Sequence, residues 1–200
     1  MHVITRASLA DRRAVMRGAA GLSLFSLFGG ARALAAPMPD MGSGKIAAPT
    51  LAELAKFPRL APGKQGESFA VALPNGERHI FRVSGGDTGP ATVESIGPNG
   101  ARKTSTIAEN DTPVAMLRGG GAATTGTQKS SSGSFWGCYA TCMIGKIGQG
   151  AWNNLKTNWL SCWNQAQSKK KWWQKVLKFT QCIFTLPYGS YAIACFGVCG

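Results

Sequence analysis

The pattern of apolar and polar positions along this 200-residue chain changes near residue 135. Between residues 68 and 107, apolar and polar residues alternate, and a period of two is typical of strands with one buried face. Asn-Gly pairs at 75–76 and 99–100 each separate two such runs and supply the positive φ angles of tight hairpins. The pattern predicts four short antiparallel strands, which are too small to be stable without another part of the chain to pack against.

From Phe135 onward, apolar residues recur with a period of about 3.6, which predicts helices. Segments 151–167 and 169–184 each place their apolar residues on one stripe and their polar residues on the opposite face. Segments 134–148 and 190–199 are more apolar and are expected to be inner helices. The C-terminal region thus predicts about four short helices in roughly 65 residues, and it is the partner that the strands need.

All six cysteines lie in this helical region. Two CxxxC pairs, one at each end of the region, each place two sulfur atoms about one turn apart on a helix face. Six cysteines allow fifteen pairings, and their spacing alone does not choose among them. We favour the nested set because it ties the two ends of a small region together. Its pairs are Cys138–Cys199, Cys142–Cys195 and Cys162–Cys182.

Other roles for the cysteines fit less well. Zinc sites often include histidine, and the region has none. Iron–sulfur and thioredoxin-like sites use CxxC spacing, which is absent. After Asp111 the chain has no Asp, Glu or His to act as a general acid or base. We therefore expect structural disulfides, no metal or other cofactor, no catalytic residue and no enzymatic activity.

The N-terminal residues have the parts of an export signal: basic residues, a short apolar stretch, and small residues before a cleavage point. Arg12 and Arg13 resemble the pair of a twin-arginine (Tat) signal, with a general secretory signal as the alternative. Ala33 and Ala35 favour cleavage after residue 35. The mature chain is therefore expected to be secreted, into surroundings where disulfides persist.

Residues 118–134 consist mostly of Gly, Ser, Thr and Ala and are expected to form a flexible linker. Such linkers are also where proteases cut, with a plain spacer as the alternative. The whole pattern predicts an α+β protein: a small antiparallel β-hairpin module followed by a disulfide-stapled all-α mini-domain. The expected divisions are a Tat-type signal peptide (1–35), an irregular segment (36–66), the β module or pro-region (67–117), the linker (118–134) and the helical domain (135–200).

Charge is as unevenly distributed as the cysteines. The formal net charge is +13, and residues 129–200 contain eight lysines with no Asp or Glu, which suggests a polyanionic partner. All six tryptophans lie between residues 136 and 173, and Trp and Lys together favour the surface of an anionic membrane. The expected membrane-binding residues are Trp152, Lys156, Trp159, Trp163, Lys169, Lys170, Lys171, Trp172, Trp173, Lys175 and Lys178.

Two alternatives to membrane binding remain at this point. The tryptophans could instead form a small core, with Lys169, Lys170 and Lys171 in a solvated loop. Nucleic acid is the competing polyanion because Trp and Lys also serve single strands. Export argues against nucleic acid, so anionic membrane lipids are the expected partner.

The motif "DRRAVMR", the linker and the "CYATC…CFGVC" ends resemble halocin-like cysteine-rich bacteriocin precursors with a twin-arginine signal peptide. The resemblance implies a released C-terminal peptide and an N-terminal part that binds this peptide and confers immunity, a role suited to the β module. We therefore expect an exported antimicrobial precursor whose C-terminal peptide permeabilises anionic bacterial membranes. The alternative is an uncleaved secreted structural or protein-binding module.

Overall fold

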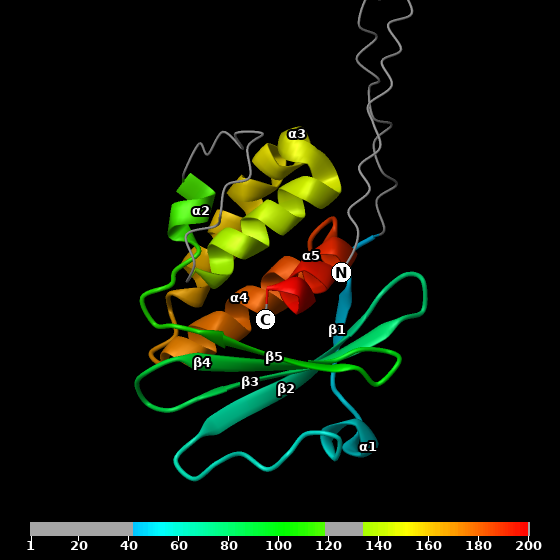
Figure 1. The fold of residues 1–200 in the computed structure, drawn as a ribbon, viewed down its shortest axis with the longest axis vertical. Coiled ribbons are helices and arrows are strands. Elements are labelled where there is room, and N and C mark those ends of the chain that lie inside the picture. Colours follow the sequence, from blue (N-terminus) through cyan, green and yellow to red (C-terminus); the bar gives the residue numbers. More distant parts are fainter. Residues whose placement is uncertain (1–41, 119–133, 200) are drawn as a thin grey trace, which may run out of the picture. The chain divides into compact units, whose positions relative to one another are not determined.

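A computed structural model of the chain describes residues 42–118 and 134–199, which belong to one compact unit that spans residues 37–200 (Figure 1). The expected signal peptide, with Arg12, Arg13, Ala33 and Ala35, lies outside the described residues. Most of the expected linker, residues 119–133, lies outside them as well.

The described N-terminal part forms one antiparallel sheet with the strand order β1-β2-β3-β4-β5 (Figure 1). The hairpin turns contain Gly76 and Gly100, with φ angles of 85° and 78°, as the two Asn-Gly pairs predict. The four expected strands are β2 to β5. The strands are β1 (Lys45–Ala47), β2 (Gln65–Ala72), β3 (Arg78–Gly85), β4 (Ala91–Ile96) and β5 (Arg102–Ile107).

Strand β1 was not predicted, and the expectation of an irregular segment over residues 36–66 is wrong at this strand. Its three residues are too few for an alternating pattern, and they form a strand because they pair with Ala70–Ala72 of β2. A short helix, α1 (Leu51–Leu54), follows with a capping box made by Thr50 and Glu53. Tertiary pairing therefore orders β1, whereas a local capping motif starts α1.

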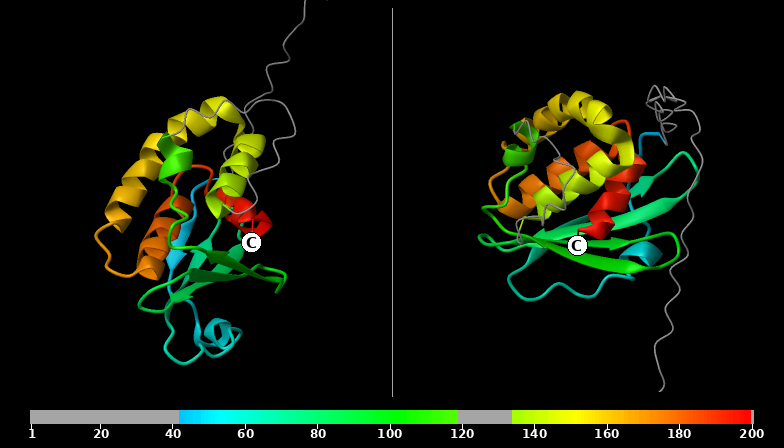
Figure 2. Two further views of the ribbon diagram at one scale, coloured as in Figure 1. Left: turned by 60° about the vertical axis from the view of Figure 1, so that its left-hand side comes forward. Right: turned by 45° about the horizontal axis from the view of Figure 1, so that its top comes forward.

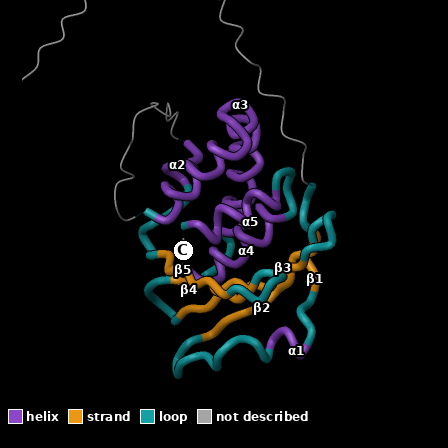
Figure 3. The backbone as a smooth tube through the Cα atoms, turned by 45° about the vertical axis from the view of Figure 1, so that its right-hand side comes forward, coloured by secondary structure: helices purple, strands orange, loops and turns teal. Residues whose placement is uncertain are grey.

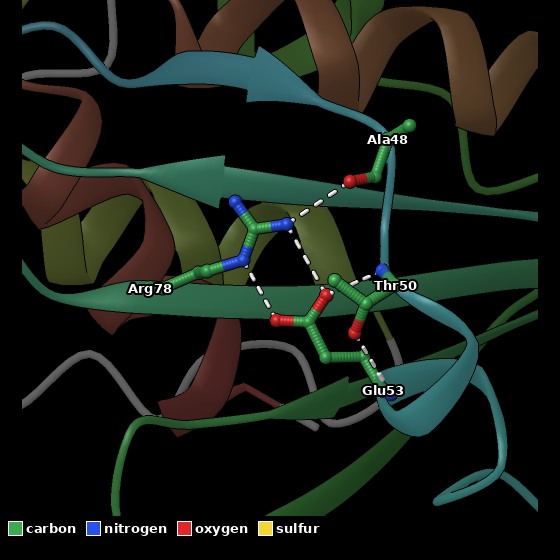
Figure 4. Close-up of polar contacts among 4 residues, drawn as sticks. All are labelled: Ala48, Thr50, Glu53 and Arg78. Atoms are coloured by element: carbon green, nitrogen blue, oxygen red, sulfur yellow. Dashed lines mark hydrogen bonds and ion pairs between the residues drawn. The ribbon is translucent and has the colours of Figure 1, made fainter.

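Three arginines hold residues 48–58 against the outer face of the sheet. Arg78 forms an ion pair with Glu53, at 2.7 Å between Nε and Oε1, and donates to the carbonyl oxygen of Ala48 (Figure 4). Arg82 pairs with the buried carboxylate of Glu94, donates to the Pro58 carbonyl, and lies 4.7 Å from the centre of the Phe57 ring. Arg102 donates to the carbonyl of Lys56. Residues 48–58, held by these charge-assisted bonds, thus cover the sheet face opposite the C-terminal helices.

The C-terminal part is helical, as predicted. Figure 2 shows the bend in α3, where Gly148 has φ 80° and ψ 158° and divides it into two helical stretches. With α4 and α5, the region after residue 134 therefore has four helical stretches, the number expected from the sequence. The helices are α2 (Val114–Arg118), α3 (Phe135–Ala166), α4 (Trp172–Phe184) and α5 (Gly189–Val198).

Three disulfides cross-link the helices, and they are the pairs of the nested set. Two join the first stretch of α3 to the C-terminal end of the chain, and the third joins the second stretch of α3 to α4. Their Cα–Cα distances are 5.8 Å for Cys138–Cys199, 5.6 Å for Cys142–Cys195 and 5.7 Å for Cys162–Cys182. The α+β fold, with an antiparallel sheet followed by a stapled helical region, is as predicted.

Helices α3, α4 and α5 lie on one face of the sheet, and α4 is the helix in closest contact with the strands (Figure 3). The sheet contributes Phe69 and Phe81, whose rings stack at 5.3 Å, and the α4 residue Phe184 lies 4.9 Å from Phe81. From α5, Phe196 packs edge-on against Phe184 at 5.8 Å. Sheet and helices thus share one hydrophobic core.

Gly85 on β3 is needed for this contact. A Cβ atom at this position would lie 2.8 Å from the Cβ of Trp173 on α4, so the helix or the strand would have to shift. We expect Gly85→Ala to lower the free energy of unfolding by about 1–3 kcal/mol, as overpacking does, measured by urea denaturation. Gly145→Ala is the control, because the same atom would meet nothing within 4 Å there. Equal stability of the two variants would contradict the close contact.

The Glu53–Arg78 pair predicts a pH dependence. The hydrogen bonds from Arg78 and Thr50 lower the pKa of Glu53 from 4.5 to about 2. Because the folded-state pKa is the lower one, this stabilisation is present above pH 4.5 and is lost as the pH falls toward 2. We expect Glu53→Gln to flatten the stability profile in this range, measured by chemical denaturation at several pH values. Glu67→Gln, which changes an exposed carboxylate on β2, should keep the wild-type slope.

Candidate membrane-binding surface

The structure places the tryptophans of the expected membrane site inside the protein. None of these five tryptophans, nor Trp136, is more than 6 % exposed. Trp152 and Trp159 on α3 meet edge-on at 5.0 Å, and Trp163 meets Trp172 of α4 at 5.9 Å. The apolar stripe of segment 151–167 therefore packs against other parts of the protein in this structure.

The lysines of the expected site lie at the surface. Lys169, Lys170 and Lys178 are exposed, and Lys156 and Lys175 are half-buried. Lys171 is also half-buried, and its Nζ atom lies 2.8 Å from Oδ1 of Asp87 and 2.8 Å from the side-chain oxygen of Gln65. The structure thus separates the two halves of the expected site, with the cations outside and the indole rings inside.

Helix α4 explains the separation. Its apolar residues follow the helical repeat, and all of them on the side that faces the sheet and α3 are buried. Thr180 is the polar residue on this side, and its hydroxyl donates within the helix to the carbonyls of Val176 and Leu177. Lys178 is exposed, whereas Lys171, the N-cap residue, reaches Asp87 and Gln65 of the sheet part. The buried set is Trp172, Trp173, Val176, Leu177, Phe179, Thr180, Ile183 and Phe184.

The indole N–H groups are unequally satisfied. Trp172 donates to the backbone oxygen of Ile107 on β5 at 3.0 Å. The Nε1 atoms of Trp136, Trp159 and Trp173 are buried without a hydrogen-bond partner among the described residues. Leaving a buried donor unpaired costs about 1–3 kcal/mol. The packed state therefore gains apolar burial at the expense of these three donors.

A seam of polar contacts joins the sheet side to the helical region. The backbone N–H of Gly44, just before β1, donates to the carbonyl oxygen of Phe184 at 3.0 Å. Lys103 on β5 donates to the carbonyl of Gly197 on α5. These bonds and the Lys171–Asp87 pair are non-covalent, and all three disulfides lie within residues 138–199.

Asp111 makes two hydrogen bonds across the seam. Its carboxylate accepts from the Ser134 hydroxyl at 2.8 Å and from the Phe135 backbone N–H at 2.6 Å. Ser134 in turn accepts from the N–H of Gly137 as the N-cap of α3. A carboxylate at the start of a helix satisfies open N–H donors and interacts favourably with the helix dipole.

Asp87 takes part in the seam at the surface. The hydrogen bond from Lys171 lowers the pKa of this exposed carboxyl, and the opposite charge of the lysine adds to the effect. The sequence reasoning missed both aspartates. One signal in the sequence pointed to them. Because no Asp or Glu follows Asp111, any side-chain carboxylate that pairs with a lysine of the helical region must come from residues up to 111.

Among the residues that the structure describes, no helix has the length and hydropathy needed to span a membrane. Within the same residues, no group of three or more His, Cys, Asp or Glu side chains is arranged to hold a metal ion. His79, on β3, is half-buried, and its Nε2 atom lies 3.7 Å from Glu77. Burial lowers the pKa of this histidine.

No protein-family model, no curated protein and no solved structure matches the chain.

The Asp111 contact can be tested by substitution. We expect Asp111→Ala to lower the free energy of unfolding by about 1–2 kcal/mol, because the Ser134 and Phe135 donors lose their acceptor. Asp87→Ala removes an exposed ion pair and should have little effect. Urea denaturation of both variants measures the difference. A larger loss for Asp87→Ala would show that the seam depends on the surface pair instead.

Proposed function

We propose that the chain is an exported, bacteriocin-like antimicrobial precursor in which the sheet covers a cationic peptide that permeabilises anionic bacterial membranes. The peptide is the helical region, residues 135–200, and it is released by cleavage in the linker. The observation that carries the proposal is the placement of the disulfides. All three connect parts of the helical region with one another, and none connects that region to the sheet.

This placement has a direct consequence for a cut between residues 119 and 133. The helical stretches would stay joined through Cys138–Cys199, Cys142–Cys195 and Cys162–Cys182. The sheet would be held only by apolar packing and the polar seam. A cut chain can therefore separate into two parts, or remain a complex in which the sheet still binds the peptide.

The surface charge supports an anionic membrane as the partner. Lys169, Lys170 and Lys178 are exposed while the sheet is still in place, and each lysine near an anionic surface contributes about 1 kcal/mol to binding. The precursor can thus approach the membrane before release. Nucleic acid is not the proposed partner.

The tryptophans support a second stage. Trp172 and Trp173 contact the sheet at the Ile107 carbonyl and at Gly85, so these two rings reach lipid only after the sheet has left. The other tryptophans have their ring contacts within the helical region. At the interface between lipid tails and water, an indole ring keeps apolar contact while its N–H finds an acceptor. Transfer to the interface would therefore supply a partner for the unpaired donor of Trp173.

The shared core favours a second candidate function. Trp173 packs on the backbone of β3, and Phe184 packs on Phe69 and Phe81 of the sheet. A joint core of this kind is also what a permanently intact protein needs. In this second function the chain is an uncleaved secreted structural or protein-binding module. Three disulfides fit an extracellular protein in either case.

Vesicle leakage separates the two functions. A specific protease site is placed in residues 119–133, and the full chain is tested before and after cleavage on vesicles of anionic phosphatidylglycerol and of neutral phosphatidylcholine. We expect the intact chain to bind anionic vesicles without leakage, and the cut chain to release their contents. A cut chain that causes no leakage, together with only intact chains in culture supernatant by mass spectrometry, would favour the uncleaved module.

Matched charge variants test the binding surface in the same assay. The double variant Lys169→Gln/Lys170→Gln removes two exposed charges from the loop between α3 and α4. The matched control, Arg59→Gln/Lys64→Gln, removes two exposed charges from the loop before β2. The first pair should weaken anionic vesicle binding by roughly tenfold or more, since two lysines contribute about 2 kcal/mol. The second pair should change it less. Equal losses would indicate an effect of net charge alone.

A further inference from the structure

A groove in the helical region lies outside the membrane-binding residues. It has a volume of about 350 Å³ and is formed by the second stretch of α3 and the turn between α4 and α5. Its lining contains two amide side chains, apolar side chains and one aromatic ring, and no charged residue. The lining residues are Ala151, Asn154, Leu155, Asn158, Pro187 and Tyr188.

The aromatic residue of the groove has an unusual backbone. Tyr188 has φ 65° and ψ 21°, and it is the one residue other than glycine with a positive φ among those described. The left-handed region is unfavourable for a residue with a Cβ atom, and turns of this kind usually use Gly or Asn. Such strain is found disproportionately where a side chain serves a function.

Asn154 and Asn158 lie one turn apart on α3 and are both exposed, so their side-chain amides are neighbours at the groove. Each amide has two N–H donors and an acceptor oxygen. The exposed face that continues from them is polar and uncharged, which is unusual in so basic a region. It comprises Asn153, Asn154, Thr157, Asn158, Ser161, Asn164 and Gln165.

We propose that this groove binds a neutral saccharide, with Tyr188 as the platform for a sugar ring and Asn154 and Asn158 as hydrogen-bond partners of its hydroxyl groups. Hydroxyl groups both donate and accept, as amides do. The C–H face of a sugar ring suits an aromatic ring and the apolar side chains of Leu155 and Pro187. The groove is at the lower end of the size range of ligand sites, so it fits about one or two sugar units.

A short neutral peptide is the other ligand with amide-compatible groups. The groove favours the saccharide because both of its amides lie on a helix, which offers a peptide no strand edge to pair with. Every lining residue belongs to the disulfide-linked region, so the groove persists after a cut in the linker. The inference goes beyond the proposed function and does not depend on permeabilisation. A glycan on the bacterial surface would be the natural source of the ligand.

The test is a titration of the isotope-labelled full chain with chitotetraose, a neutral tetrasaccharide, followed by NMR. We expect chemical shift changes at the groove residues, with a dissociation constant on the order of a millimolar, as suits so small a site. Tyr188→Gly removes the ring and relieves the positive φ at the same time. It should weaken binding about tenfold, and the relief of the positive φ should offset part of the stability lost with the packing of the ring on Tyr191 and the core.

Asn158→Ala, at an exposed position, should weaken binding about tenfold as well, since one hydrogen-bonding group is lost. It keeps the test decisive if the Tyr188 variant fails to fold. Asn164→Ala, on the same face but outside the groove, is the matched control and should bind as wild type. The proposal is overturned if chitotetraose causes no shift changes at ten millimolar, if both groove variants bind normally, or if a neutral tetrapeptide binds in its place.

Discussion

The contact between α4 and the inner face of the sheet is the interaction on which the rest of the structure depends. This contact buries Trp173 over Gly85 and places Phe184 against Phe81. A sheet of this size is marginal alone, and a helix with so apolar a face is not stable in water. Each part therefore supplies the surface that the other lacks. Helices α3 and α5 pack on α4, so its position determines which of their side chains are covered.

The same contact decides what the surface offers to other molecules. An amphipathic helix that binds a membrane turns its apolar face to lipid and its cations to the head groups. In this fold the sheet occupies the place of the lipid, and Lys169, Lys170 and Lys178 remain exposed. Under the proposed function, electrostatic attraction to a membrane would be available while the sheet still covered Trp172 and Trp173. The indole donors of Trp136, Trp159 and Trp173 stay unpaired in the packed state, which costs about 1–3 kcal/mol for each.

Local signals in the sequence were sufficient for the hairpins, whereas the choice of cross-links also needed the argument that a small region must have its two ends tied together. Asn-Gly turns pair neighbouring strands, and CxxxC spacing on helices points two sulfur atoms the same way. The burial of Trp172 and Trp173 was not predictable in this way, because an apolar stripe has the same period whether it meets protein or lipid. Strand β1 forms only beside its partner strand, and Asp111 finds its donors at the start of a helix distant in sequence. The groove at Tyr188 forms where α3 meets the turn between α4 and α5. These are tertiary features without a local pattern.

Disulfides cross-link the helical region internally, whereas the contacts described between this region and the sheet are non-covalent. The difference determines what a separation of the two parts would leave intact. Cross-links that close loops of 61, 53 and 20 residues stabilise the helical region by restricting its unfolded state, by about 2–4 kcal/mol each. They would remain if the proposed cleavage released the sheet, but they would not replace the apolar surface that the sheet covered. The released region would keep its connectivity and expose the buried face of α4 to water. Such a face must find a new apolar partner, and a lipid interface is the one that also accommodates the lysines and the indole donors.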